Sequence, residues 1–290
     1  MSPPGRPKGE YRSAQREGTP MSMNWFHELS SSTLALIIVV ATLTISIAGL
    51  AFTAGRVRET KLHEQLDNGT IAGLLAALVG IYAIAAGLTA VAVWGETQDA
   101  GNNVAKEAAA ITVLFHDLTG YPQPLRNQTR NMLVEYTRYV IEQEWPLHQH
   151  GEAPTGLLKS IDEMERQLFA FEPATEGQKI VHALVLRSYN TVIEMRRLRL
   201  QAVGDTALPG ALWIVVILLG VIAISSCFLL RLDSFALHAA ITTLVAAPIA
   251  LILYFIAVTD RPFQGGVSVS AEPYRIVLEQ IMIPELKRGN

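Results

Sequence analysis

The chain has 290 residues, of which 50% are hydrophobic and only 17% are charged, and its mean hydropathy is +0.29. Soluble domains carry roughly 25% charged residues, so this composition indicates an integral membrane protein. The formal net charge of -3 provides no basic field, which argues against a nucleic-acid partner. The single cysteine, Cys227, excludes an intramolecular disulfide and a cysteine-built metal centre.

The N-terminal residues 1–24 are rich in proline, glycine, serine and charge, and we expect them to form a disordered tail. Met21 and Met23 are candidates for the initiating residue besides Met1. The first apolar segment is long and lies far from the N-terminus, so we expect a retained anchor and not a cleaved signal.

Four apolar segments, near 33–54, 71–94, 208–230 and 235–258, contain no acidic residue, lysine or arginine. A helix needs roughly 20 residues to cross a hydrocarbon core. The alternation typical of a membrane β-barrel is absent, so the predicted fold class is all-α. We place transmembrane helices 1 and 2 in residues 25–94 and helices 3 and 4 in residues 208–258.

Between the second and third spans lies a polar block, residues 95–207. Its pattern predicts four helices near 97–118, 124–145, 157–171 and 174–202, with a break at Gly120 to Pro124. Apolar residues recur at spacings of three and four in the second and fourth of these, which indicates buried stripes. We expect a cytosolic four-helix block here and a C-terminal tail at 259–290.

The positive-inside rule predicts that both termini and residues 95–207 face the cytoplasm of a cell or inner membrane. The lysines and arginines that support this orientation lie in three places. Arg6, Lys8, Arg12 and Arg16 precede the first span; Arg196, Arg197 and Arg199 precede the third; Arg261, Arg275, Lys287 and Arg288 follow the fourth. The opposite side carries fewer (Arg56, Arg58, Lys61, Arg231).

The second span carries a stripe of small residues. Gly73, Gly80 and Gly87 lie seven apart, and an alanine follows each of them three residues later. Small residues let helices approach closely in lipid. We interpret the stripe as helix packing within one subunit, and the alternative places it at a subunit interface or around a pore axis.

Hydroxyl groups lie on one face of the first span, where Thr42 and Ser46 are one turn apart. They are candidates for lining a wet ion pathway. The alternative is that each hydroxyl bonds the carbonyl one turn back, as Ser and Thr commonly do in helices.

No catalytic motif is present: the sequence lacks a P-loop, a GxSxG turn and an HExxH pair. His148, His150 and Glu152 form a loose cluster, but two imidazoles without a framing fold do not predict a metal site. We interpret most block carboxylates, among them Glu107 and Glu144, as a solvated helix face. We therefore expect no enzyme activity, cofactor or metal.

Three clusters lie close to the predicted membrane boundary: Glu144-Trp145-Pro146, the arginines Arg196, Arg197 and Arg199, and Asp260-Arg261-Pro262-Phe263. Three interpretations of the arginines are open. They anchor the chain to anionic lipid headgroups, they form a cationic vestibule that selects anions, or they pair with Glu144, Glu194 or Asp260. The Asp260-Arg261 pair is a candidate lock between helices.

In this order, these motifs resemble the bestrophin-like domain family of membrane proteins, over about residues 24–283. Leu208-Pro209, Leu212-Trp213 and Gly265-Gly266 belong to the same resemblance. The resemblance implies a relation to bestrophins, which are oligomeric, calcium-gated anion channels with four membrane helices per subunit. The bestrophin calcium site needs an acidic run, but here the segment 265–272 offers only Glu272, so calcium gating is not expected. The bulky pore neck of bestrophins is replaced by the Gly/Ala stripe.

Two functions follow as hypotheses. The first is an oligomeric channel in the lipid bilayer that passes small inorganic ions, in particular anions, through a cytosolic vestibule. The second is a membrane-anchored scaffold or sensor whose helical block binds a cytosolic partner.

Overall fold

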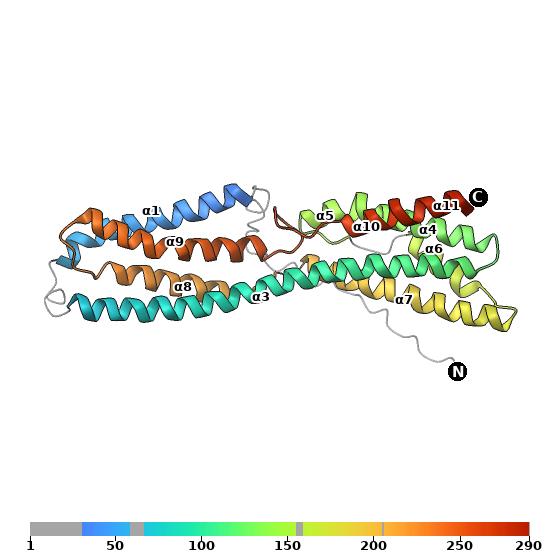
Figure 1. Ribbon diagram of the computed structural model, residues 1–290, viewed down its shortest axis with the longest axis horizontal. Coiled ribbons are helices and arrows are strands. Elements are labelled where there is room, and N and C mark those ends of the chain that lie inside the picture. Colours follow the sequence, from blue (N-terminus) through green and yellow to red (C-terminus); the bar gives the residue numbers. More distant parts are fainter. Residues whose placement is uncertain (1–30, 59–66, 155–158, 205, 290) are drawn as a thin grey trace, which may run out of the picture.

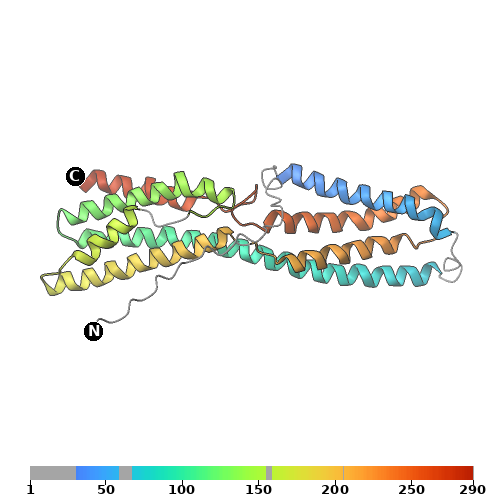
Figure 2. The same cartoon turned by 180° about the vertical axis from the view of Figure 1, so that it is seen from behind.

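A computed structural model describes residues 31–58, 67–154, 159–204 and 206–289. Within these ranges every regular element is a helix, and the helices form two bundles placed end to end (Figures 1 and 2). We call residues 31–58, 68–94 and 210–259 the apolar half, and residues 95–204 and 260–289 the polar half. One helix, α3, belongs to both.

The helix α3 (Asn68–Asp117) is continuous over 50 residues, about 75 Å at a rise of 1.5 Å per residue. It starts after Asp67, whose carboxylate accepts a hydrogen bond from the Thr70 amide at 2.6 Å. The span expected at 71–94 and the block helix expected near 97–118 are parts of this one helix. The linking residues include a glycine but no proline, and one glycine costs a packed helix only about 1 kcal/mol.

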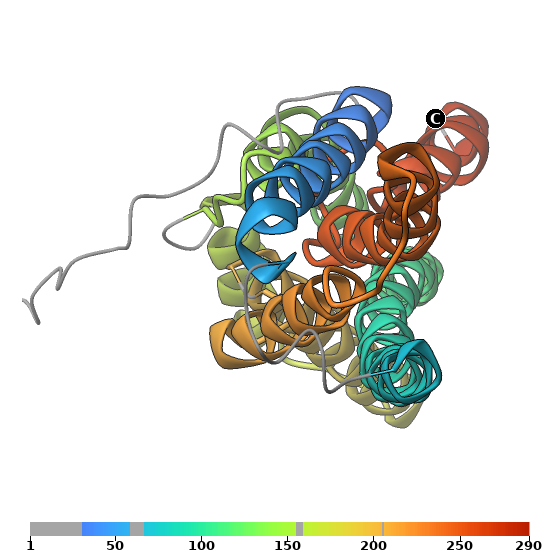
Figure 3. The ribbon, with the colours of Figure 1, turned by 90° about the vertical axis from the view of Figure 1, so that its left-hand side faces the viewer.

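The apolar half contains α1 (Ser31–Arg58), the start of α3, α8 (Gly210–Cys227) and α9 (Phe235–Thr259). Within the described ranges, four helices are long and apolar enough to cross a membrane, which confirms the predicted number. Seen from this end, α1 and α3 lie at opposite edges, with α8 and α9 between them (Figure 3). Only 17–33% of each span's most apolar window is buried, so the remaining surface is available to lipid or another copy.

In the polar half, α7 (Glu176–Gly204) packs along the second part of α3. The helix α4 (Leu125–Tyr139) begins after the short turn η2 (Leu118–Gly120) and continues through the π-helix η3 (Val140–Glu144) into α5 (Trp145–Gln149). The helix α6 (Lys159–Ala170) packs on α4. One core of large apolar side chains, among them Ile111, Phe115 and Met164, joins these helices.

The predicted C-terminal tail is largely helical. It forms α10 (Glu272–Ile276), the π-helix η4 (Val277–Met282) and α11 (Ile283–Gly289). Tyr274, Val277, Leu278 and Met282 are buried in the core of the polar half, because their spacing of three and four places them on one helical face. The end of the chain thus returns to pack on α3 and α4.

Candidate functional site

A network of buried charges lies at the centre of the polar half. Glu107 comes from α3, Glu144 from the end of η3, and Arg196 and Arg199 from α7. Arg199 donates a hydrogen bond to Glu107 from Nε at 2.8 Å and another to Glu144 from Nη2 at 2.7 Å. Arg196 donates a hydrogen bond to the other carboxylate oxygen of Glu144 at 2.6 Å. Glu107, Glu144 and Arg199 are 0% exposed, so these ion pairs are fully shielded from water.

Three further polar side chains complete the network. Tyr136 donates its hydroxyl to Glu107 at 2.6 Å. His148 Nε2 accepts a hydrogen bond from the Arg199 guanidinium, and His148 Nδ1 lies 3.2 Å from the Glu152 carbonyl oxygen. Because one ring nitrogen accepts and the other faces an acceptor, the ring proton is on Nδ1. The buried Tyr274 ring lies beside the Arg199 guanidinium, with its centroid 5.8 Å from the central guanidinium carbon.

The rings of Trp145, Phe263 and Tyr274, which we call the aromatic wall, pack beside the charged network. The ring of Trp145 packs edge-on against those of His148, Phe263 and Tyr274, with centroids 5.7–5.8 Å apart. Edge-to-face contacts of this kind exclude water and hold the rings in one arrangement. The His148 ring is therefore fixed between Arg199 and the aromatic wall.

The environment sets the charge state of these groups. Burial alone raises the pKa of the Glu144 carboxyl, but Arg199 and Arg196 outweigh it, so its pKa lies below the usual value. Burial disfavours the charge on Arg199, yet Glu107 beside it holds the pKa of the guanidinium well above its ordinary value. Burial and then the Arg199 charge lower the pKa of His148 to about 4. At neutral pH His148 is neutral beside a charged Arg199.

The structure separates the three arginines that the sequence singles out. Arg196 and Arg199 pair with Glu144, one of the three partners named among the alternatives. Arg197 is exposed and forms no ion pair with any described residue. The solvated-face interpretation is wrong for Glu107 and Glu144. Glu107 carried a signal that sequence reasoning missed, because it lies on the same stripe as the buried Val104 and Ile111.

His148, Tyr136 and Tyr274 are members of the site that the sequence did not reveal. His148 lies only four residues after Glu144, but it joins Arg199 across 51 residues of chain. Within the described ranges, no group of three or more metal-binding side chains is present. Every ionic group at the centre of the network has a protein partner, so the arrangement is suited to holding helices together.

Asp260 connects the two halves at the end of α9. Its carboxylate accepts hydrogen bonds from the Leu208 amide at 2.8 Å and from the Trp213 indole at 3.4 Å. Its backbone carbonyl accepts a third hydrogen bond, from the Ala207 amide at 2.9 Å. The predicted lock between helices therefore acts on the start of α8. Arg261 instead donates to Gln264 at 3.2 Å, and the Phe263 ring enters the aromatic wall.

We expect Asp260→Ala to destabilise the protein by about 1–3 kcal/mol, because it leaves the buried Leu208 amide without an acceptor. The thermal unfolding midpoint of the purified protein in detergent measures the loss. Asp233→Ala, in the exposed turn between α8 and α9, is the matched control and should leave the midpoint unchanged. Equal midpoints for the two variants would contradict the assigned role of Asp260.

The sequence matches the family model described as "Bestrophin-like domain" over residues 36–274. The chain belongs to the bestrophin-like domain family. A mutant of a bacterial bestrophin homologue from Klebsiella pneumoniae has a similar crystal structure: the TM-score is 0.66 at 12% identity, covering 85% of this chain and 98% of that one. A second crystal structure, of a mutant membrane protein, gives 0.65 at 13%, covering 85% and 97%. No curated protein sequence matches the chain significantly.

In this bestrophin-like chain the motifs that suggested the family meet in space. Glu144 and Trp145 contact Arg196, Arg199 and Phe263, although these residues come from three distant segments. Pro146 starts α5 beside them, and the carbonyl of the buried Pro262 accepts from the Val269 amide at 2.8 Å. These residues of the family pattern therefore belong to one tertiary network in the polar half.

The glycine stripe faces away from the rest of the bestrophin-like chain. A Cβ added at Gly73, Gly80 or Gly87 would meet no described atom within 4 Å. Packing within one subunit, the first interpretation, is therefore wrong for these three glycines, because Tyr82, Ala86 and Val93, on another face of α3, share a buried core with α8 and α9. The glycines are left open toward lipid or another copy.

Two hydroxyls of α1, those of Ser46 and Thr53, are satisfied within the helix. Ser46 donates to the Thr42 carbonyl at 2.6 Å and Thr53 to the Gly49 carbonyl at 2.8 Å, which is the alternative to a wet pathway. Thr42 and Ser46 line a largely apolar groove between α1, α8 and α9 with a volume of about 290 Å³. The groove lies within the apolar half.

Proposed function

We propose that the protein is an oligomeric membrane channel for small anions, in which the exposed face of α3 packs against neighbouring copies around the ion pathway. The observation that carries this proposal is the glycine stripe, which is open along the membrane part of α3 although the same helix is packed on its other face. Small residues are what close helix contacts in lipid require.

The family supports the proposal, because bestrophins, which the chain resembles, are oligomeric anion channels. The exposed face extends beyond the membrane part of α3: Gln98 and Ala105 continue it into the polar half. In our proposal the polar half lies in the cytoplasm, in agreement with the distribution of lysine and arginine, and forms the entrance to the pathway. Arg197 is the arginine of its group that remains free to meet an ion.

Ion flux in liposomes that contain the purified protein tests the proposal. We expect chloride and nitrate gradients to dissipate faster than a potassium gradient, at the same rate with and without calcium, because the segment 265–272 has one carboxylate. Empty liposomes are the control. Absence of flux from folded, correctly inserted protein would overturn the channel proposal and favour a scaffold that binds a cytosolic partner.

A single substitution tests the stripe. We expect Gly80→Leu to reduce flux at least about tenfold and to shift the oligomer toward monomer, because a large side chain separates helices that small residues bring together. Gly210→Leu is the matched control, since a Cβ at Gly210 also meets open space and Gly210 lies on α8. Flux assays and size-exclusion chromatography would contradict the proposal if both variants behave alike.

A further inference from the structure

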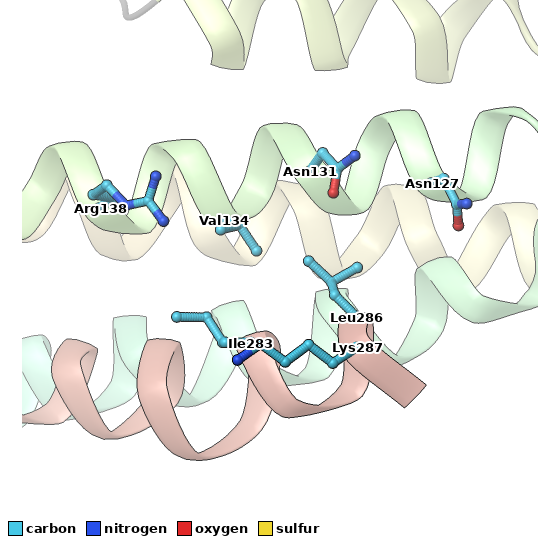
Figure 4. Close-up of a pocket in the computed structure, with 7 residues that line it drawn as sticks. All are labelled: Asn127, Asn131, Val134, Arg138, Ile283, Leu286 and Lys287. Atoms are coloured by element: carbon cyan, nitrogen blue, oxygen red, sulfur yellow. The ribbon is translucent and has the colours of Figure 1, made fainter. Parts of the chain in front are cut away.

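A groove separates α4 from α11 in the polar half (Figure 4). Its volume is about 340 Å³, within the range of roughly 300–1,000 Å³ typical of small-molecule sites. Four residues of α4 and three of α11 line it: Asn127, Asn131, Val134, Arg138, Ile283, Leu286 and Lys287. Their spacings of three and four place each set on one face of its helix.

The lining combines cations and amides with an aliphatic surface. Arg138 and the two asparagines are spread along α4 and face α11 across the groove, and Lys287 extends along α11 (Figure 4). Val134, Ile283 and Leu286 supply the apolar contacts. Neither Arg138 nor Lys287 forms an ion pair with any residue that the structure describes, whereas the exposed Lys179 and Arg166 each pair with a glutamate one turn away.

No described carboxylate lines the groove, and two acidic residues of the helices that form it, Glu285 and Glu135, are directed elsewhere. Glu285 on α11 accepts from Arg130 Nη2 at 2.7 Å and lies 3.6 Å from His116 Nδ1. Arg130 is itself held over the Phe115 ring, 3.8 Å from its centroid. Glu135 lines a different groove, against α6. The ion pair fixes α11 in place and leaves the groove with an excess of positive charge.

We propose that this groove binds a small organic anion. A carboxylate or phosphate group would lie between the Arg138 guanidinium and the Lys287 ammonium, since arginine binds such groups through paired hydrogen bonds. A short apolar body would contact Val134, Ile283 and Leu286, and the asparagine amides would orient the ligand. Because the bound anion contacts both helices, it holds α11 in place against α4.

The place of the groove distinguishes a soluble ligand from a lipid headgroup. The helix α11 ends at the tip of the molecule opposite the apolar half (Figure 1). A headgroup in the membrane that contains the apolar half does not reach this tip. The ligand is therefore a soluble anion.

Calorimetric titration of the full chain in nanodiscs of neutral lipid, with pyrophosphate and with succinate as probes, tests the site. We expect saturable binding of at least one probe, weakened at least about tenfold by Arg138→Gln and by Lys287→Gln, because each removes a charged partner. Arg187→Gln is the matched control, because Arg187 is exposed on α7 and does not line the groove, and this variant should bind the probe normally. Hydrogen exchange at residues 283–289 should slow when the probe binds.

Three results would overturn the proposal. The first is the absence of saturable binding of either probe. The second is binding that neither groove variant weakens, which would place the anion elsewhere. The third is probe binding that is lost when the neutral lipid of the nanodiscs is replaced by anionic lipid, which would assign the cations to a lipid surface.

Discussion

Replacing Arg199 by methionine is expected to lower the free energy of unfolding of the polar half by about 3–5 kcal/mol, the cost of removing one partner from a buried ion pair. The guanidinium joins Glu107 and Glu144, and its removal leaves Glu107 without a cationic partner among the described residues. Guanidinium titration of the protein in detergent, followed by far-UV circular dichroism, measures the change.

Arg197→Met is the control for this experiment, because Arg197 lies two residues away on the same helix and is exposed. Its free energy of unfolding should change by less than about 0.5 kcal/mol. The double variant Arg199→Met with Glu107→Met should lose less than the sum of its single changes, because it removes both charges. Additive losses would show that the two groups do not interact.

Acidification is expected to destabilise the folded state by about 2–3 kcal/mol between pH 6.5 and pH 4. The pKa of His148 falls from 6.5 to about 4 on folding, because the ring is buried and faces Arg199. Below pH 6.5 the His148 ring is protonated in the unfolded chain but stays neutral in the folded chain down to about pH 4. The free energy of unfolding is therefore highest above pH 6.5 and falls as the pH decreases toward 4. Glu144, whose pKa is lowered, adds a further loss as the pH falls below its ordinary value of 4.5.

His148→Gln isolates the contribution of the imidazole. A glutamine oxygen can accept from Arg199 but does not titrate, so the decline between pH 6.5 and pH 4 should flatten. His150→Gln, on the exposed side of the same turn, should leave the pH profile unchanged. Unfolding titrations at a series of pH values provide the comparison, and a steep decline in the His148→Gln variant would assign the effect to other groups.

The membrane-facing half of the fold could be predicted from the sequence. Four apolar segments long enough to cross a bilayer leave few alternatives to spanning helices, because unpaired backbone groups are too costly in lipid. The resemblance to the bestrophin-like domain family also rested on local motifs, and the family model confirms it. Composition and segment length were sufficient for the spans, and the resemblance of the ordered motifs was sufficient for the family.

The candidate site could be predicted only in part. Arg196, Arg199 and Glu144 stood out as charges near a membrane boundary, and pairing was one of three interpretations. His148 was noted only beside His150 and Glu152, and the bonds of Tyr136 to Glu107 and of His148 to Arg199 were not predicted. These partners lie 29 and 51 residues away in the chain, and no local pattern encodes such a contact.

By itself, the sequence determined the helical class and the four spans, which depend on composition and local spacing, and the family, which its ordered motifs resemble. Only the tertiary structure decided that α3 is continuous, that Arg196 and Arg199 are buried in ion pairs and that the three stripe glycines face outward. Each of these depends on which helix faces meet. A charge on an apolar helical face is stable only when a distant partner neutralises it, and that partner becomes visible once the chain is folded.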